Sequence, residues 1–295
     1  MKYLDPKADL TFKKIFGNHP KRLISLLNAL LPLSEEEQIH EIEYLPTELV
    51  PEINSYRYAV ANILCTDAMS NKFCVVIRIE WSNVFKQRVL FNASKLYVSQ
   101  AKKGERYCAL QPVYSLNLVN DIFERDTPEF IHNYRIVHDK DSNKVIEGLH
   151  FTFIELPKFT PHSISDKRMM VLWLRFLTEI NANTQEIPSD LLRDPEIGKA
   201  VEELKTSGFT DAELRAYDKF WDAVSVERTL QYDSYQQGIE KGMEEGMKQG
   251  MAKGEEVGKS QRSIEIAKNM LAKGMDEATI QEITGLTEDQ ILQIQ

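Results

Sequence analysis

The sequence predicts an α/β fold, a mixed sheet flanked by helices, followed by a helical region and a glycine-striped helical tail. Residues 56–119 read as strand, turn, strand, helix and strand. Residues 165–230 place apolar side chains at helical spacing, and a glycine recurs every four residues from Gly238 to Gly258. Strands interleaved with helices favour a sheet that helices cover on its faces.

The composition indicates a globular protein with an acidic balance. The chain has 295 residues, 42% of them hydrophobic, which can supply a large core. The formal net charge of −9 excludes a protein that coats nucleic acid through its overall charge, but it leaves room for a local basic patch.

The cysteines and the hydropathy pattern predict a cytoplasmic protein. Cys65, Cys74 and Cys108 are widely spaced without CxxC pairing, so we expect reduced core thiols rather than a disulfide. No apolar run reaches the roughly 18 residues of a spanning helix, so we expect no membrane partner.

Two short helices are expected before the sheet. Residues 9–16 place apolar residues at helical spacing, and Gly17 follows as a C-cap. Residues 21–31 carry a leucine stripe between Pro20 and Pro32.

The sheet and its covering helix follow. We expect strands near residues 42–45, 56–66, 73–79, 110–119 and 145–156. A helix should run from about Phe85 to Ala101. Residues 165–230 should be wholly helical, packed on the sheet or forming a small subdomain beside it.

The glycine repeat changes the character of the chain. On a helix, a spacing of four keeps these glycines in one slowly drifting stripe, and each glycine costs about 1 kcal/mol of propensity relative to alanine. The stripe therefore indicates either a flexible charged linker or a helix that packs or self-associates into a homo-oligomer. The six glycines are Gly238, Gly242, Gly246, Gly250, Gly254 and Gly258.

The last residues should form a small helical unit. Asp276 caps one short helix, and Thr287-Glu-Asp-Gln290 is a capping box for a final helix after Gly285. Two short helices joined by a glycine turn can form a helix-turn-helix. Because the final helix has no basic residue, we expect it not to read a DNA groove.

Short motifs along the whole chain suggest a family. They are Asp9-Leu-Thr-Phe-Lys-Lys-Ile-Phe-Gly17, Leu26-Leu-Asn-Ala-Leu30, Phe85-Lys-Gln-Arg88, Lys95-Leu-Tyr97, Gln100, Phe153-Ile-Glu-Leu-Pro-Lys-Phe159 and, after the glycine repeat, Ile283-Thr-Gly-Leu286. Together they resemble the recombination-promoting nuclease (Rpn) family of transposase-like proteins with the PD-(D/E)XK nuclease fold.

The resemblance implies four segments. Residues 1–160 would form the PD-(D/E)XK restriction-endonuclease-like domain, and residues 161–232 a helical region on or beside it. Residues 233–262 would form the glycine-striped helix, and residues 263–295 the C-terminal helical unit.

The resemblance also implies a Mg²⁺-dependent DNA endonuclease, and here the sequence departs from its family. An Asp on one strand and a Glu on the next would hold the metal, with a Lys or Gln two residues later. These positions carry Asn62, Val76 and Arg78 in this chain. Asparagine offers one neutral oxygen and valine none, so we expect Mg²⁺ to bind poorly or not at all.

Other carboxylates are weaker candidates. If Asn62 pairs with Val76, then Asp67 lies at the hairpin tip, about nine residues and roughly 30 Å from Glu80. One ion cannot bridge that distance. A displaced site would instead combine Glu80 with Glu48 or Glu52.

Three functions remain open. The first is DNA binding by a degenerate nuclease fold, with phosphate contacts from Arg57, Lys86, Arg88, Lys95, Lys102 and Lys103. The second is an active Mg²⁺-dependent endonuclease with displaced ligands. The third is a non-catalytic interaction protein that oligomerises through the glycine stripe.

Overall fold

The computed structural model describes residues 2–45, 59–80, 85–101, 109–161 and 168–294. These form two units, Met1–Arg228 and Thr229–Gln295. The sheet contains β1 (Ile39–Tyr44), β2 (Ala59–Asp67), β3 (Lys72–Glu80), β4 (Val113–Val119), β5 (Ile131–His138) and β6 (Asp141–Glu155). The α-helices of the first unit are α1 (Asp9–Phe16), α2 (Pro20–Leu30), α3 (Lys86–Ser99), α4 (Arg168–Glu179), α5 (Ser189–Arg193) and α6 (Pro195–Glu203). Helix α7 (Asp211–Ala272) begins in the first unit, and α8 (Glu277–Thr284) and α9 (Glu288–Leu292) follow in the second.

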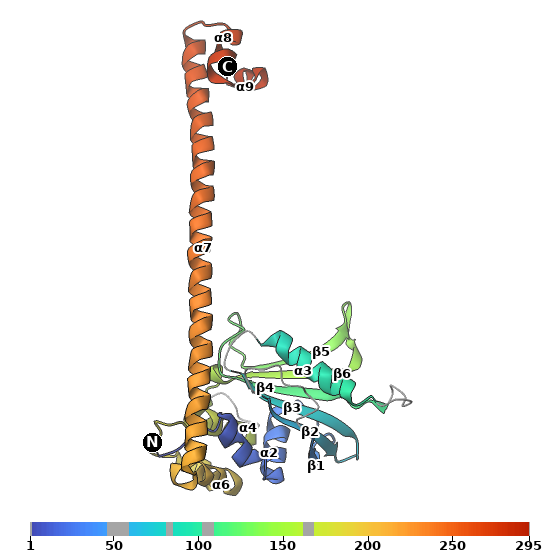
Figure 1. Cartoon of the computed structure of the whole chain (residues 1–295). Helices are drawn as coiled ribbons and strands as arrows, with labels where there is room; N and C mark the ends of the chain where they lie inside the picture. The colour runs from blue at the N-terminus through green and yellow to red at the C-terminus, as the bar shows by residue number, and fades with distance from the viewer. Residues whose placement is uncertain (1, 46–58, 81–84, 102–108, 162–167, 295) are drawn as a thin grey trace. The chain divides into compact units, whose positions relative to one another are not determined.

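The six strands form one mixed sheet in the order β1-β2-β3-β4-β6-β5 (Figure 1). Strands β1, β2 and β3 pair antiparallel, whereas β3, β4 and β6 run parallel to one another. Helix α3 connects two of the parallel strands, which need a crossover. The predicted α/β class is therefore confirmed.

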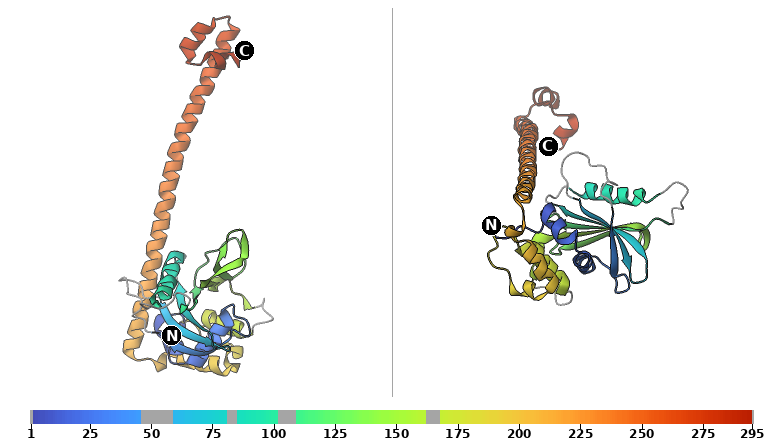
Figure 2. Two further views of the ribbon diagram at one scale, coloured as in Figure 1. Left: turned by 90° about the vertical axis from the view of Figure 1, so that its right-hand side faces the viewer. Right: turned by 60° about the horizontal axis from the view of Figure 1, so that its bottom comes forward.

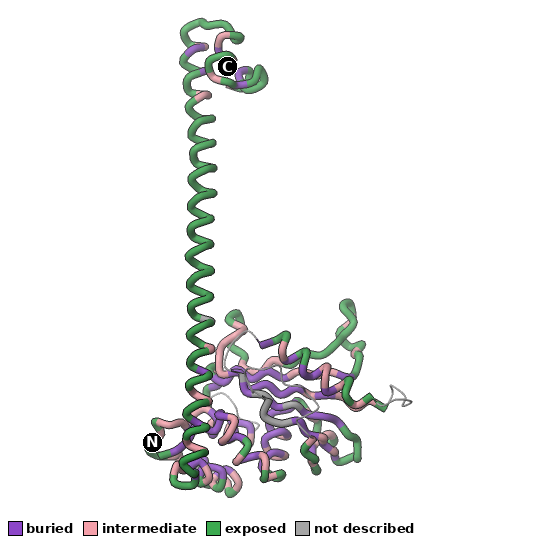
Figure 3. The backbone as a smooth tube through the Cα atoms, viewed as in Figure 1, coloured by how far each residue is buried: buried purple, intermediate pink, exposed green. Residues whose placement is uncertain are grey.

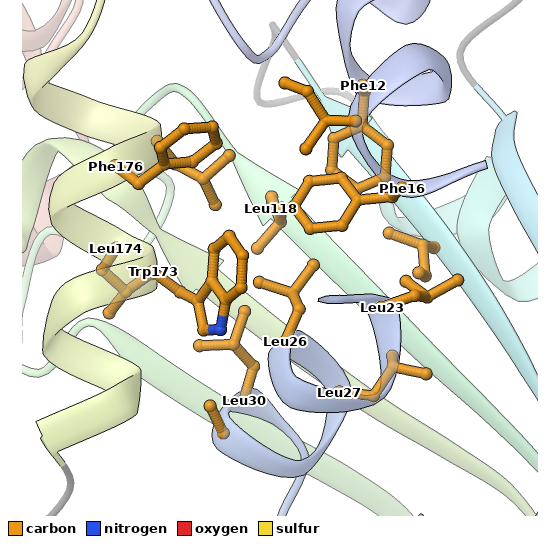
Figure 4. Close-up of a cluster of buried hydrophobic side chains, with 14 of the residues drawn as sticks. Phe12, Phe16, Leu23, Leu26, Leu27, Leu30, Leu118, Trp173, Leu174 and Phe176 are labelled. Carbon is orange, nitrogen blue, oxygen red and sulfur yellow. The ribbon is translucent and has the colours of Figure 1, made fainter. Parts of the chain in front are cut away.

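Helices cover both faces of this sheet (Figure 2). One face packs on α1, α2 and α4 in the main core, where the Trp173 ring lies among the leucines of α2 and donates a hydrogen bond to Ser25 (Figure 4). The other face packs on α3 through Phe85 and Val89 near the strand ends and Ala93 and Leu96 further along. The apolar residues whose helical spacing predicted these helices are the residues that the helices bury.

The expected helical region is interrupted. Helix α4 ends at Glu179 and α5 begins at Ser189, and residues 204–210 also lack α-helix. Buried residues of α4, α5 and α6 belong to the main core, so these helices complete the sheet domain instead of forming a separate one.

Strand β5 is missing from the sequence-based expectation, and β6 begins at Asp141 rather than at residue 145. Strand β5 is an edge strand and most of its side chains are exposed, so no dense apolar run marks it. The distal part of the β5–β6 hairpin extends beyond the pairing of β6 with β4, which begins at Leu149.

Two cysteines lie in the first unit's sheet without bonding to each other. Cys65 pairs across the hairpin with Phe73, and Cys74 pairs with Leu64, so the two thiols point to opposite faces. Burial raises the pKa of both thiols, that of Cys74 to about 11. Cys108 lies outside the described residues.

The second unit contains the glycine repeat and a small helical cluster. The repeat is helical, and no heavy atom would meet a Cβ added at any of the six glycines. The surrounding residues are exposed around the helix (Figure 3), including Met243, Met247 and Met251 at 70%, 68% and 71%. The glycine repeat is therefore part of a helix, and the alternative of a flexible linker does not describe it.

The C-terminal cluster has the capping expected from the sequence. Asp276 accepts a hydrogen bond from the Thr279 N–H, and Thr287 and Gln290 form the capping box. Gly285 has a left-handed φ of 69°, which favours glycine at that turn. Ile280 and Ile291 are buried in a small core belonging to this unit.

Candidate functional site

The hairpin register brings the family's two expected metal positions together. Asn62 of β2 pairs directly with Val76 of β3, and Arg78 follows two residues later on β3. Alternate strand positions share a face, so the register places positions 76, 78 and 80 along the face that α3 covers. The side chains of Val76, Arg78 and Glu80 lie outside the described part of the structure, as do residues Glu48 and Glu52.

The described side chains beside this position are buried, polar and neutral. Asn62 is 6% exposed. Ser115 and Asn117, on the neighbouring strand β4, are 1% and 0% exposed. The Asn117 amide donates to the backbone oxygens of Ser115 at 3.0 Å and Thr152 at 3.3 Å. Ser115 and Asn117 also hydrogen-bond to each other, and none of these three side chains is a carboxylate.

Asp67 lies at the hairpin tip, as expected, and stabilises the turn. Its carboxylate accepts hydrogen bonds from the backbone N–H groups of Met69 and Asn71 at 2.9 and 2.8 Å, and from the Asn71 amide at 2.9 Å. Desolvation opposes ionisation, but these hydrogen bonds lower the pKa of Asp67. Among the residues that the structure describes, no cluster of three His, Cys, Asp or Glu side chains could hold a metal ion.

The candidate phosphate-binding residues lie on opposite flanks of α3. Each helical residue advances about 100°, so Lys86 shares one flank with Tyr97, and Arg88 and Lys95 share the other. The Tyr97 ring lies beside Gly148 of β6, and α3 contacts β4 and β6. Strand β3 is on the far side of β4 from β6, so Arg88 and Lys95 face the side of β2 and β3.

Lys86 is engaged elsewhere. Its ammonium forms an ion pair with Glu124 at 2.8 Å and lies 4.7 Å from the centre of the Phe123 ring. The hydrogen bond to Glu124 raises the pKa of Lys86. Arg57, Lys102 and Lys103 lie outside the described residues.

A second polar cluster, at the carboxyl end of β6, explains the Phe153–Phe159 motif. Glu155 is completely buried and accepts hydrogen bonds from the backbone N–H groups of Phe123 and Glu124, while His132 lies 2.9 Å away. Lys158 pairs with Glu155 and donates to backbone oxygens of Glu124, Thr127 and Glu129. The sequence identifies this motif only as a family marker, because its partners lie 23–34 residues away in the chain.

Comparison with known families decides the assignment. The family described as PD-(D/E)XK nuclease family transposase matches residues 6–230. The chain belongs to this family. The Rpn/YhgA-like nuclease family, C-terminal HTH domain, matches residues 260–295. No curated protein and no solved structure matches the chain significantly.

The two matches confirm the resemblance to recombination-promoting nucleases and the helix-turn-helix character of the tail. The PD-(D/E)XK family match spans the sheet and the helices α4 to α6, in agreement with their common core. Within the described ranges, no helix is long and apolar enough to span a membrane.

Proposed function

We propose that this PD-(D/E)XK family protein binds DNA but has lost the metal site that would cut it. The observation that carries the proposal is the pairing of Asn62 with Val76 at the two positions where the family uses an Asp and a Glu. A hard dication needs several oxygen ligands, preferably charged ones. One neutral amide oxygen opposite a hydrocarbon side chain does not provide them.

The same proposal assigns DNA contact to the side of α3 that faces β2 and β3. Arg88 and Lys95 are half-buried there, and the described side chains of the neighbouring floor, Asn62, Ser115 and Asn117, carry no negative charge that would repel phosphates. Arg57 and Lys86 are further candidates from the sequence, although the ion pair with Glu124 favours a structural role for Lys86. The match of the tail to a helix-turn-helix domain supports DNA association of the chain, although the final helix of that domain, α9, carries no basic residue for a phosphate contact.

A plasmid-cleavage assay with Mg²⁺ or Mn²⁺, run beside a gel-shift assay, tests this proposal. We expect the wild-type chain to shift DNA and leave it intact. Robust cutting that disappears in Glu80→Ala would contradict the proposal and support the alternative, an active endonuclease with displaced ligands that include Glu80 and Glu48.

A second candidate function is assembly. The glycine stripe and the exposed methionines next to it favour association between copies of this chain, because helices with small residues at i, i+4 can approach closely. In this reading the protein is a homo-oligomeric interaction protein, and DNA cleavage plays no part. Either function suits a cytoplasmic protein, which the unpaired thiols of Cys65 and Cys74 support.

A further inference from the structure

The flank of α3 that carries Arg88 and Lys95 also presents an aromatic side chain. Phe91 is 56% exposed, and the Lys95 ammonium lies 6.0 Å from the centre of its ring. Phe91 lies three residues after Arg88 and four residues before Lys95, each about one helical turn, so all three project from the flank of the helix on the β2–β3 side.

The rest of α3 supports a functional reading of this exposure. The helix already buries Val89, Ala93 and Leu96 against the sheet, so its packing does not require a phenylalanine on the outer flank. An exposed ring beside a cation is the combination that proteins use to stack an unpaired base while holding the adjoining phosphate.

We propose that Phe91 and Lys95 form a binding platform for single-stranded nucleic acid. This inference rests on the proposed DNA binding and names its substrate class. A base stacks on the ring of Phe91, and Lys95 attracts the backbone. In a duplex the faces of the bases are covered by their neighbours, so an aromatic ring of this kind gains a partner only where the strands are unpaired. The buried neutral row of Asn62, Ser115 and Asn117 beside this flank adds no charge that would repel the strand.

Fluorescence anisotropy with the full chain tests the platform, using labelled oligo-dT of about 20 nucleotides and a duplex of equal length. We expect Phe91→Ala to weaken binding to oligo-dT by about 5- to 150-fold and to leave duplex binding unchanged. Phe91→Trp should retain the affinity for oligo-dT, because it keeps a ring at this position. Lys95→Gln should weaken both complexes and make both less sensitive to salt.

Leu90→Ala is the matched control. Leu90 is 51% exposed but lies on the opposite flank of α3, with Lys86 and Tyr97, so its removal should change neither affinity. Two results would overturn the inference. In the first, Phe91→Ala binds oligo-dT as tightly as the wild type does, which would point to a protein partner for Phe91. In the second, Phe91→Ala loses affinity for the duplex as much as for oligo-dT.

The assay also separates this inference from the proposed function. A wild-type chain that binds the duplex but not oligo-dT would overturn the platform and leave DNA binding intact. A chain that binds neither probe would overturn both.

Discussion

Glu155 illustrates why a carboxylate near the ends of the parallel strands need not be a metal ligand. Its oxygens are occupied by two backbone N–H groups, by His132 and by Lys158, which fix the loop that follows β4. Asn62 is the opposite case. Its position on the hairpin suits a metal ligand, but its neutral amide side chain binds a divalent ion weakly. Sequence motifs located both residues. Only the fold reveals that Lys158 also donates hydrogen bonds to three loop carbonyls, because these carbonyls belong to a segment that is distant in the sequence.

At this scale we predict that Lys158→Met destabilises the protein by about 3–5 kcal/mol, because the buried carboxylate of Glu155 loses its cation. Urea unfolding followed by circular dichroism measures the change. The control is Lys144→Met, at a lysine whose side chain is 71% exposed, which should change stability by less than about 0.5 kcal/mol. Equal effects of the two substitutions would contradict the structural role of Lys158.

The same carboxylate predicts a pH dependence. Burial opposes ionisation of Glu155, yet hydrogen bonds from Lys158, Glu124, His132 and Phe123 lower its pKa. A lowered folded-state pKa contributes stability above the unfolded-state pKa and loses it as the pH falls through the folded-state value. The stability difference between wild type and Glu155→Gln should therefore stay level from about pH 7 to about pH 5 and shrink as the pH falls below about 5. A difference that stays constant over this range would argue against an ionised Glu155.

At the level of elements, periodicity predicts what is buried and misses what is exposed. The stripes of α2 and α4 and the apolar runs of β3 and β4 were visible because the core selects them. Strand β5 was not visible, because His, Asn and Arg interrupt its apolar residues without a regular alternation, and most of the strand is exposed at the sheet edge. The breaks between α4 and α7 were also missed, since apolar residues there serve the core without regular spacing.

Helix α7 provides a prediction at this scale. Replacing Gly246 and Gly250 with alanine adds about 1 kcal/mol of helix propensity at each site, so helicity should rise. If the stripe joins two copies, the added methyl groups separate the backbones, and the molar mass from light scattering should fall toward that of one chain. Lys248→Ala, between them on the opposite face of the helix, is the control. An unchanged mass in the double-alanine variant would count against association through the stripe.

At the level of the whole molecule, the chain is built from two units with separate cores. Every residue of the main core lies before Arg228, and the cluster around Ile280 and Ile291 lies wholly after Thr229. The change in character at the glycine repeat predicted such a division. The sequence could not place the boundary inside a helix, because α7 runs through it without a break.

This organisation predicts the behaviour of a truncated chain. Residues 1–228 should unfold cooperatively with the same urea midpoint as the first unit of the full chain, because no core contact is removed. If the flank of α3 carries DNA binding, the truncated chain should also retain it. Loss of DNA binding with unchanged stability would assign that activity to the helix-turn-helix unit instead.

The most direct test of the central claim is a calorimetric titration with Mn²⁺. We expect the wild-type chain to bind no ion at the hairpin, because Asn62 and Val76 do not supply its ligands. The variant Asn62→Asp/Val76→Glu restores two facing carboxylates and should bind Mn²⁺ in a saturable manner. Saturable binding by the wild type that is lost in Glu80→Ala would contradict the account and show that a working metal site persists.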